Sequence, residues 1–442
     1  MIADLRPYAE YKESGQHWLG QIPAAWQVRR AKFLFREIDE RSKTGKEELL
    51  SVSHKTGVTP RSQKSVTMFL AESNVGHKLC HPQDLVINTL WAWMAALGVS
   101  RHAGIVSPAY GVYRPLAPDK FLPRYADLLL RTPTYAAEYQ RRSTGVNSSR
   151  LRLYPEYFFR IPVLVPSANE QAAIVRFLDW ANGRLERAVR AKRRELALIG
   201  EMLSVVTESA LQLEGTRTLR LSTVAEVKAR PIDRRADQSY TRIGLYNRGR
   251  GIFHKATTDG AELGDSDFFW VEDGDFVISG QFAWEGAVAL ARAKDSGCVA
   301  SHRYPILRGR EEYASSAVLC ALFRTPYGSM LLDHHSRGAA GRNRPLNAAR
   351  LLKEKVLIPP LSAQARITEL LDQENAVAQS LAQTIHFINE YRTRLVADVV
   401  TGKVDVREAA ARLPDEVAPD TVEDDTDFAD DETEAADEEA AA

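Results

Sequence analysis

Residues 163–179 read VLVPSANEQAAIVRFLD, and residues 356–372 read VLIPPLSAQARITELLD. Eight of the seventeen positions are identical, and the two stretches are offset by 193 residues. Each stretch has the pattern of a short apolar strand, a proline and the start of an amphipathic helix. The chain therefore contains a long internal repeat.

The repeat extends upstream of these two stretches. LLRTPTY (129–135) matches LFRTPYG (322–328), and STG (143–145) matches SRG (336–338) at the same offset. PQDLVIN (82–88) matches DGDFVIS (273–279) at an offset of 191 residues. A repeat of this length is too long for a solenoid and predicts two copies of a whole domain with its connector.

A long helix is predicted at the end of each copy. Apolar residues recur at spacings of three and four from about 169 to 213 and from about 363 to 400, with a stutter in the first run. Gly215 and Gly402 are plausible stop positions. The apolar stripes are narrow, so we expect the two helices to pair with each other. The alternative is that each helix packs on its own domain.

The segments before the helices mix β-branched runs with frequent Gly and Pro, which favours compact α/β (α+β) domains. The predicted boundaries are a first domain at 1–165, a first long helix at 166–214, a second domain at 215–358, a second long helix at 359–413, and an acidic, disordered tail at 414–442.

The net charge of zero conceals a basic body. Residues 414–442 carry 14 Asp or Glu and no Lys or Arg, so the other residues carry 58 basic against 44 acidic side chains, or +14. Such a body suits a polyanion, although a solvated basic surface is the alternative. The sequence has neither a long apolar run nor a secretory signal, and its three cysteines are scattered. A cytoplasmic protein that does not span a membrane is therefore expected.

Motifs for catalysis are missing from the sequence. It has no phosphate-binding loop, no GxGxxG after a strand, no methyltransferase motif for a flipped adenine and no HExxH. We therefore expect no catalytic residue, no metal site and no cofactor bound by this chain.

Several segments combine cationic side chains with amides, aromatic rings and glycine, the groups that contact phosphates and base edges. The tryptophans among them also suit a core position, and the other residues could simply be solvated surface. The predicted DNA-binding residues are Lys55, Arg61, Lys64, Trp91, Trp93, Arg101, His102, Arg141, Arg142, Asn147, Arg150, Asn247, Arg248, Arg250, His254, Lys255, Arg337, Arg342, Asn343 and Arg344.

Four segments together resemble the specificity subunit of type I restriction–modification systems. They are SGQHWLGQIPAAW (14–26), DLVINTLWAWMAALGVS with GIVSPAYGVYRP (84–115), EQAAIVRFLD (170–179) and EYRTRLVADVVTGKVDVR (390–407). The resemblance covers nearly the whole chain up to about residue 413 and leaves out the acidic tail.

The resemblance implies two target-recognition domains separated by two long antiparallel coiled-coil helices. It implies a non-catalytic subunit that reads a bipartite site in double-stranded DNA. Its implied partners are methyltransferase subunits, which modify adenine, and a motor/endonuclease subunit, with S-adenosylmethionine, ATP and Mg used by those partners. The N-terminal WLGQIPAAW and the outer helix faces are our candidates for partner docking.

The two copies differ where recognition is expected. The second copy has SAQ (362–364) for NEQ (169–171), and ASHRYPIL (300–307) stands where the first has SPAYGVY. We therefore expect the two domains to read different half-sites. Two alternatives stay open: a coiled-coil scaffold that binds proteins and not DNA, and a stand-alone DNA enzyme.

Overall fold

The computed structural model describes residues 5–63, 73–145, 151–338 and 344–414. The described residues form two units, with 5–189 and 384–414 in unit 1 and 190–383 in unit 2. Each unit takes its long-helix segments from two distant parts of the chain. The predicted disordered tail lies outside the described residues, apart from Pro414.

A four-stranded antiparallel sheet in the order β4-β11-β8-β9 lies at the centre of unit 1. Its strands are β4 (Phe35–Glu37), β8 (Leu85–Ile87), β9 (Leu97–Val99) and β11 (Gly111–Pro115). All three residues of β8 are buried, as suits branched aliphatic side chains in a central strand. Tyr113 of β11 lies opposite Leu85 in the register.

Unit 2 repeats this sheet in the order β14-β23-β20-β21. Its strands are β14 (Ala225–Val227), β20 (Phe276–Ile278), β21 (Val288–Leu290) and β23 (Ile306–Gly309). Leu307 lies opposite Phe276, as Tyr113 lies opposite Leu85. The predicted repeat and the mixed helix and strand class are therefore confirmed.

A hairpin and a short 3-10 turn recur beside each sheet. The hairpins are β5 (Leu50–Ser53) with β6 (Gly57–Pro60) in unit 1 and β16 (Ile243–Leu245) with β17 (Ile252–His254) in unit 2. The turns are η4 (Ala92–Met94), after β8, and η8 (Ala283–Glu285), after β20. These elements carry many of the predicted DNA-binding residues.

Two helices follow each sheet, of which the first packs on the sheet and the second on the 3-10 turn. They are α1 (Pro123–Leu130) and α2 (Pro133–Arg142) in unit 1, and α6 (Ser316–Arg324) and α7 (Pro326–His335) in unit 2. The repeated Arg-Thr-Pro sequence explains the start of the second helix, because it places Thr at the N-cap and Pro at the first helical position. At α7, the Thr325 hydroxyl accepts the Gly328 N–H (3.2 Å).

The quoted repeat forms the connection from each unit into its long helix. β12 (Pro162–Val165) pairs with β3 (Gln27–Arg30), and β24 (Lys355–Ile358) pairs with β13 (Arg217–Arg220). The chain then enters α4 (Ala168–Ala210) or α9 (Leu361–Val400). Both helices match the apolar runs of about 169–213 and 363–400, but α9 ends before residue 413, the predicted end of the second helical segment, and a separate short helix, α10 (Arg407–Ala411), follows it.

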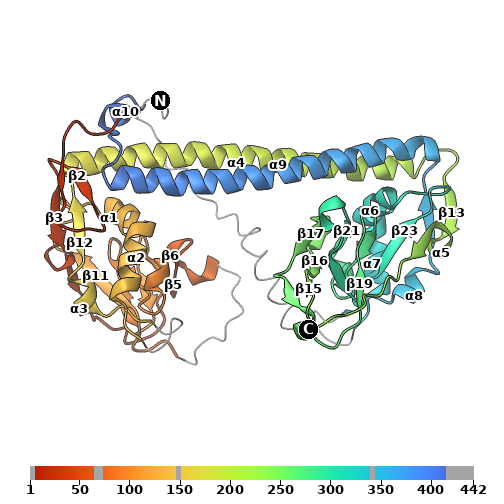
Figure 1. The fold of residues 1–442 in the computed structure, drawn as a ribbon, viewed down its shortest axis with the longest axis horizontal. Coiled ribbons are helices and arrows are strands. Elements are labelled where there is room, and N and C mark those ends of the chain that lie inside the picture. Colours follow the sequence, from red (N-terminus) through yellow and green to blue (C-terminus); the bar gives the residue numbers. More distant parts are fainter. Residues whose placement is uncertain (1–4, 64–72, 146–150, 339–343, 415–442) are drawn as a thin grey trace. The chain divides into compact units, whose positions relative to one another are not determined.

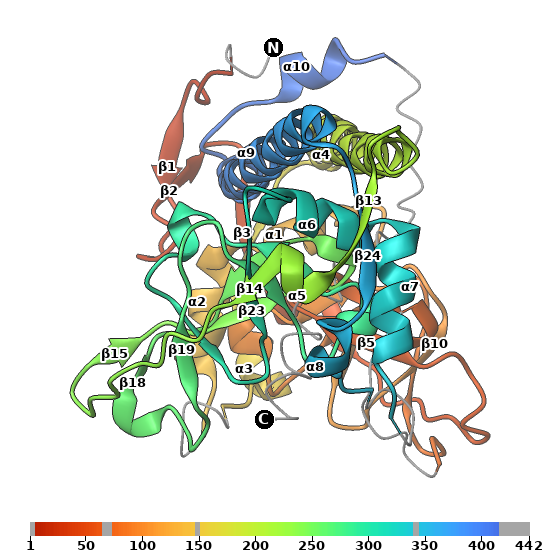
Figure 2. The same ribbon diagram turned by 90° about the vertical axis from the view of Figure 1, so that its right-hand side faces the viewer.

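Within each unit, α4 and α9 lie side by side (Figure 1, and nearly end-on in Figure 2). In unit 1, one buried cluster combines Ile174, Phe177, Leu178 and Ala181 of α4 with Leu395, Val399 and Val400 of α9. In unit 2, another combines Leu203 and Ala210 of α4 with Ile367, Leu370 and Leu371 of α9. The start of each helix thus packs on the end of the other, which confirms the antiparallel pair.

The glutamine shared by both repeats fixes the strand-to-helix junction. Gln171 is fully buried, and its Nε2 donates to the carbonyls of Pro166 (2.9 Å) and Lys120 (3.0 Å). Its Oε1 accepts the Leu122 N–H (2.8 Å). Gln364 donates in the same way to the carbonyls of Pro359 (3.0 Å) and Tyr313 (2.7 Å). This side chain satisfies backbone groups that burial would otherwise leave unpaired.

The N-terminal WLGQIPAAW segment packs into unit 1. Ile22 and Trp26 are fully buried, and Trp26 Nε1 donates to Glu170 Oε1 (2.9 Å). Gly402, the predicted stop after α9, has a φ of 80°, and a Cβ there would lie 2.4 Å from Pro23 Cδ. Ile22 and Trp26 therefore belong to the core, and partner docking through the rest of this segment stays a prediction.

The Gln171 junction yields a test of stability. We expect Gln171→Ala to lower the free energy of unfolding by about 3 kcal/mol, since three backbone groups, of which the Pro166 carbonyl is buried, lose their partner. The measurement is urea denaturation of the full chain followed by circular dichroism. Gln379→Ala, at an exposed position of α9, is the control and should cost less than about 0.5 kcal/mol. Equal effects of the two changes would contradict this role of Gln171.

Candidate nucleic-acid interface

The β5–β6 hairpin of unit 1 presents Lys55 at its exposed turn, and Arg61 follows in the 3-10 helix η3 (Arg61–Gln63). Arg131, just after α1, holds this turn from behind. Its Nη2 donates to the carbonyls of His54 (2.9 Å) and Lys55 (2.8 Å). The turn is thus fixed through its backbone, and Lys55 is exposed within it.

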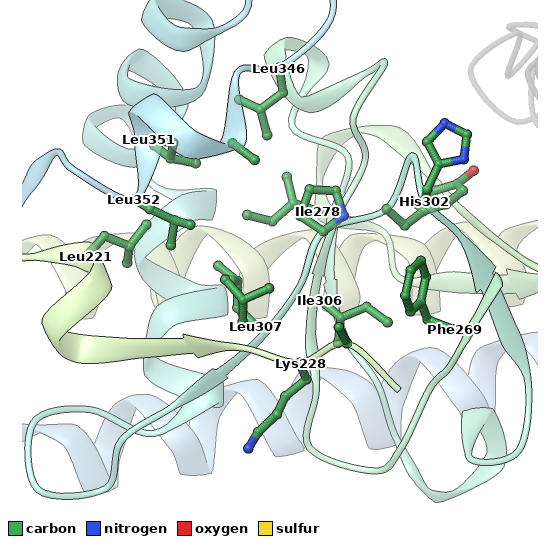
Figure 3. Close-up of a pocket in the computed structure, with 15 residues that line it drawn as sticks. Leu221, Lys228, Phe269, Ile278, His302, Ile306, Leu307, Leu346, Leu351 and Leu352 are labelled. Carbon is green, nitrogen blue, oxygen red and sulfur yellow. The ribbon is translucent and has the colours of Figure 1, made fainter. Parts of the chain in front are cut away.

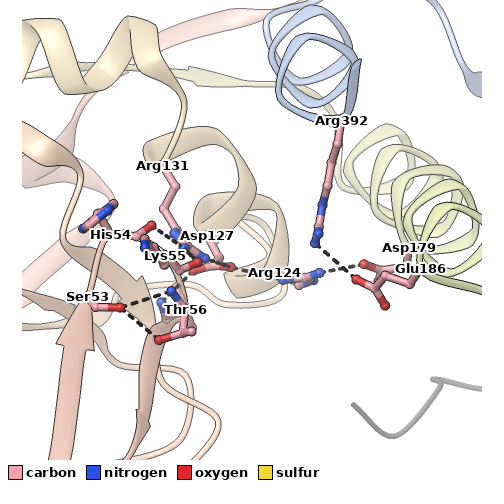
Figure 4. A network of polar contacts seen from close by, with 11 residues as sticks. Ser53, His54, Lys55, Thr56, Arg124, Asp127, Arg131, Asp179, Glu186 and Arg392 are labelled. Carbon is pink, nitrogen blue, oxygen red and sulfur yellow. Dashed lines mark hydrogen bonds and ion pairs between the residues drawn. The ribbon is translucent and has the colours of Figure 1, made fainter. Parts of the chain in front are cut away.

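A series of ion pairs continues from this turn to the long helices of unit 1 (Figure 4). Arg131 lies 3.9 Å from Asp127, and Asp127 pairs with Arg124 (3.1 Å). Arg124 then pairs with Asp179 of α4 (2.7 Å). The hairpin turn is therefore connected by charged side chains to the helix that begins at the repeated junction.

The η4 turn lies beside α2 and exposes an aromatic side chain. Trp91 is 53% exposed, whereas Ala92 is fully buried and Trp93 is half-buried. The core interpretation of Trp91 is therefore wrong, because Ala92 takes the inward position of this tight turn. The Leu153 N–H donates to the Thr89 carbonyl (3.0 Å), so Leu153 is attached next to this turn.

Arg141 and Arg142 both bind one buried carboxylate at the end of α2. Arg141 Nε lies 2.7 Å from Glu138 Oε2, and Arg142 Nε lies 2.5 Å from Glu138 Oε1. Burial raises the pKa of Glu138, but hydrogen bonds from the two guanidinium groups outweigh it and hold the pKa below its ordinary value. Two cations against one anion leave a net positive charge at the base of the loop.

Arg101 is exposed, and His102 is half-buried, in the turn between β9 and β10 (Gly104–Val106). Ser100 fixes this turn, because its hydroxyl donates to the His102 carbonyl (2.7 Å). Three further predicted residues of the first domain, Lys64, Asn147 and Arg150, lie outside the described residues.

In unit 2, the β16–β17 turn packs directly on η8. Asn247 is buried, and its Nδ2 donates to the Glu285 carboxylate, while the Gly249 N–H donates to the Gly286 carbonyl (2.8 Å). Arg248 between them is exposed and has a φ of 59°, a backbone conformation unfavourable for a side chain. Asn247 therefore positions the turn, and Arg248 is the residue that it presents.

The second predicted loop of unit 2 reaches the same turn. Arg344 stacks on Trp284 of η8 (4.9 Å from guanidinium carbon to ring centroid) and pairs with Asp333 (2.6 Å). Arg337 is exposed at the other end of this loop. The structure thus brings Arg248 and Arg344 to η8, while Arg342 and Asn343 lie outside the described residues.

The remaining predicted residues of unit 2 lie just before β17, at its end and just after it. Arg250 is exposed, its Nε donates to the Asn247 carbonyl (3.0 Å), and its guanidinium lies 5.4 Å from the Tyr246 ring. His254 pairs with the buried Asp295 (2.8 Å), and Lys255 is half-buried. His254 therefore has a partner inside the unit, and its contact with DNA stays a prediction.

Sequence reasoning missed the side chains that position these residues. Arg131 holds the hairpin turn of unit 1. Glu138 holds Arg141 and Arg142 at the end of α2. Glu285 holds Asn247 in unit 2. Glu138 had a signal, because Arg141 and Arg142 follow it at the spacings of three and four that meet on a helix. Arg131 and Glu285 act across the fold, and no local spacing points to them.

The described parts of the chain contain no cluster of three or more His, Cys, Asp or Glu arranged to hold a metal ion. Among the helices described there, none combines the length and the apolar character that crossing a membrane requires.

Comparison with solved structures identifies the architecture. A chain from a structure of complex assembly and conformational transition of the type I restriction–modification system is 16% identical, with a TM-score of 0.50. The match covers 86% of this chain and 98% of that one. This chain has the fold of a type I restriction–modification chain. The resemblance found in the sequence is thus confirmed at the level of the fold.

Two further structures of S subunits match with lower TM-scores. The HsdS subunit from Thermoanaerobacter tengcongensis has 17% identity, coverage of 87% of this chain and 98% of that chain, and a TM-score of 0.39. The type I S subunit from M. genitalium has 12% identity, coverage of 85% and 96%, and a TM-score of 0.39. No family model matches the sequence, and no curated protein matches it.

The hairpin turn of unit 1 yields a test of local stability. We expect Arg131→Ala to speed amide exchange at residues 55–57 at least about tenfold, since two hydrogen bonds of roughly 1 kcal/mol each are lost. Hydrogen exchange with mass spectrometry measures this change. Arg101→Ala, at an exposed position, is the control and should leave the turn unchanged. If amide exchange at residues 55–57 is the same in Arg131→Ala as in the unaltered chain, Arg131 does not hold this turn.

Glu138 yields a pH dependence. Its pKa is lower in the folded than in the unfolded chain, so its stabilising effect is present at neutral pH and is lost as the pH falls below the ordinary carboxyl range. We expect Glu138→Gln to destabilise the chain more at neutral pH than at about pH 3, as measured by urea denaturation. Glu10→Gln, at an exposed position, should show no such difference. A pH-independent effect of Glu138→Gln would contradict the assignment.

Proposed function

We propose that this chain is the specificity subunit of a type I restriction–modification complex, which reads a bipartite site in double-stranded DNA. The observation that supports this proposal most directly is the repeated fold. The same hairpin turn and the same 3-10 turn occur in both units, with different side chains at equivalent positions. One module used twice with different contacts is what a site of two unlike halves requires.

The residues of each unit support a division of roles. Exposed arginines and lysines such as Arg101, Lys55 and Arg337 suit phosphate contacts, which supply affinity and make it dependent on salt. Arg248 and Trp91 project from tight turns that the fold holds in place. An arginine held in this way suits a base edge, at roughly 1–3 kcal/mol for a good bidentate pair, and an aromatic ring suits apolar contact with a thymine methyl group.

In this proposal the chain itself performs no catalysis. Methyltransferase subunits would modify adenine, and a motor/endonuclease subunit would act on unmodified DNA. Those partners would use S-adenosylmethionine, ATP and Mg, and the complex would work in the cytoplasm. The fold shared with a type I restriction–modification chain supports this assignment of partners.

Selection from randomised duplexes tests the proposal. With the partner methyltransferase present, we expect the chain to enrich a split motif with an undefined centre. Trp91→Ala should relax one half of the motif, and Arg248→Ala should relax the other, whereas Lys55→Ala should weaken binding without relaxing either half. Each relaxed position should lose about 1–3 kcal/mol of discrimination, as good base contacts do.

The control is Arg394→Ala on α9, whose side chain is 85% exposed and pairs only weakly with Asp398 (3.6 Å). It should leave both halves of the motif unchanged. Enrichment of nothing would favour the scaffold protein, and modification of DNA by the chain alone would favour the stand-alone enzyme. Either result, or a single continuous motif, would contradict the proposed function.

A further inference from the structure

An apolar pocket of about 280 Å³ lies in unit 2, between the end of the sheet and α8 (Ala348–Leu351) (Figure 3). Its lining includes Leu221 near the start of the second domain in sequence, Leu351 and Leu352 near its end, and Ile278 of strand β20. The principal apolar side chains are Leu221, Phe269, Ile278, Leu307, Leu346, Leu351 and Leu352.

The repeat shows what fills this space in unit 1. Strand register makes Leu307 the counterpart of Tyr113, because these residues lie opposite Phe276 and Leu85, respectively. The offset of 193 residues makes Leu351 and Leu352 the counterparts of Phe158 and Phe159. Three leucines in unit 2 therefore stand where unit 1 has three aromatic rings.

In unit 1 those rings pack on one another. The Tyr113 and Phe158 centroids are 4.6 Å apart, and those of Tyr113 and Phe159 are 5.6 Å apart. Tyr113 and Phe158 are almost completely buried. Leu221 is the counterpart of Ala31, because their N–H groups donate to the carbonyls of Glu354 and Ile161, which the 193-residue offset relates. This leucine restores only part of the lost volume, so a pocket lined mainly by aliphatic side chains is left in unit 2.

The chemistry of the lining selects an uncharged ligand. Lys228 borders the pocket, but its ammonium group points away from the apolar side chains in Figure 3 and pairs with Glu226 (3.0 Å). His302 lies at the exposed edge. For comparison, an engineered apolar cavity of roughly 150 Å³ stays dry and binds benzene. The pocket of unit 2 is larger than that and has the same kind of lining.

From the volume, the lining and the rings of the equivalent site, we infer that this pocket binds a small, uncharged aromatic molecule of one or two rings. Such a ligand takes the place that Tyr113, Phe158 and Phe159 fill in unit 1. Leu346 lines the pocket, and its N–H donates to the Gly280 carbonyl (2.8 Å). The ligand would therefore contact the segment that follows Arg344, next to the basic loop of unit 2.

The test uses indole and the full-length chain with labelled Ile, Leu and Val methyl groups. We expect saturable shifts in the NMR signals of Ile278, Leu307, Leu351 and Leu352. The unit 1 counterparts Ile87 and Leu153 should not shift, because aromatic rings already occupy their space. Shifts that spread over both units and rise without saturation would overturn the inference, as would the lack of any shift.

Ring-filling variants separate pocket binding from weak surface binding. Leu351→Phe with Leu352→Phe copies unit 1 and should weaken indole binding at least about tenfold, since the new rings occupy the volume of the ligand. Leu352→Phe alone is the milder variant if the double change disturbs folding. Leu198→Phe, at a 47% exposed position on α4, should bind indole like the unaltered chain. Undiminished binding in a folded ring-filling variant would overturn the inference.

Discussion

The buried contact between α4 and α9 is the constraint on which both units depend. In unit 1 the cluster that contains Leu395 and Val399 also contains the sheet residues Leu85 and Tyr113. In unit 2 the cluster of Ile367 and Leu371 likewise continues into Phe276 and Leu307. The long helices are thus part of each core as well as a connection, and a narrow apolar stripe is sufficient because each helix serves two cores in succession.

Much of this architecture could be read from the sequence. The identical Gln171 and Gln364, the prolines before the helices and the helical spacing located the repeat and the long helices, because these signals depend on local geometry. The sequence did not reveal the topology of the domains, since strands of three residues carry too little periodicity. Trp91 shows the same limit: its neighbour Ala92 takes the buried position, and only the fold decides between them.

The candidate interface was predicted less completely than the fold. Segments rich in Arg, Asn and Gly were found, yet composition does not separate a residue that faces outward from one that holds the loop. Asn247 and Arg344 were predicted to contact DNA, and both make contacts within unit 2, with Glu285 and Trp284. Arg131 holds the β5–β6 turn and Glu138 holds Arg141 at the end of α2, although neither is among the predicted residues.

The division of unit 1 between two distant chain segments affects how the protein is made. Its core includes Val399, Val400 and Val406, which the ribosome adds more than 200 residues after Val189, the last residue of the unit's first segment. Unit 2 ends at Gln383 within the described residues, so these residues have all been synthesised before the ribosome adds residues 384–400, the part of α9 that belongs to unit 1. The N-terminal half therefore has to wait for the C-terminal residues, and the order in which the units mature is the reverse of the order in which they are translated.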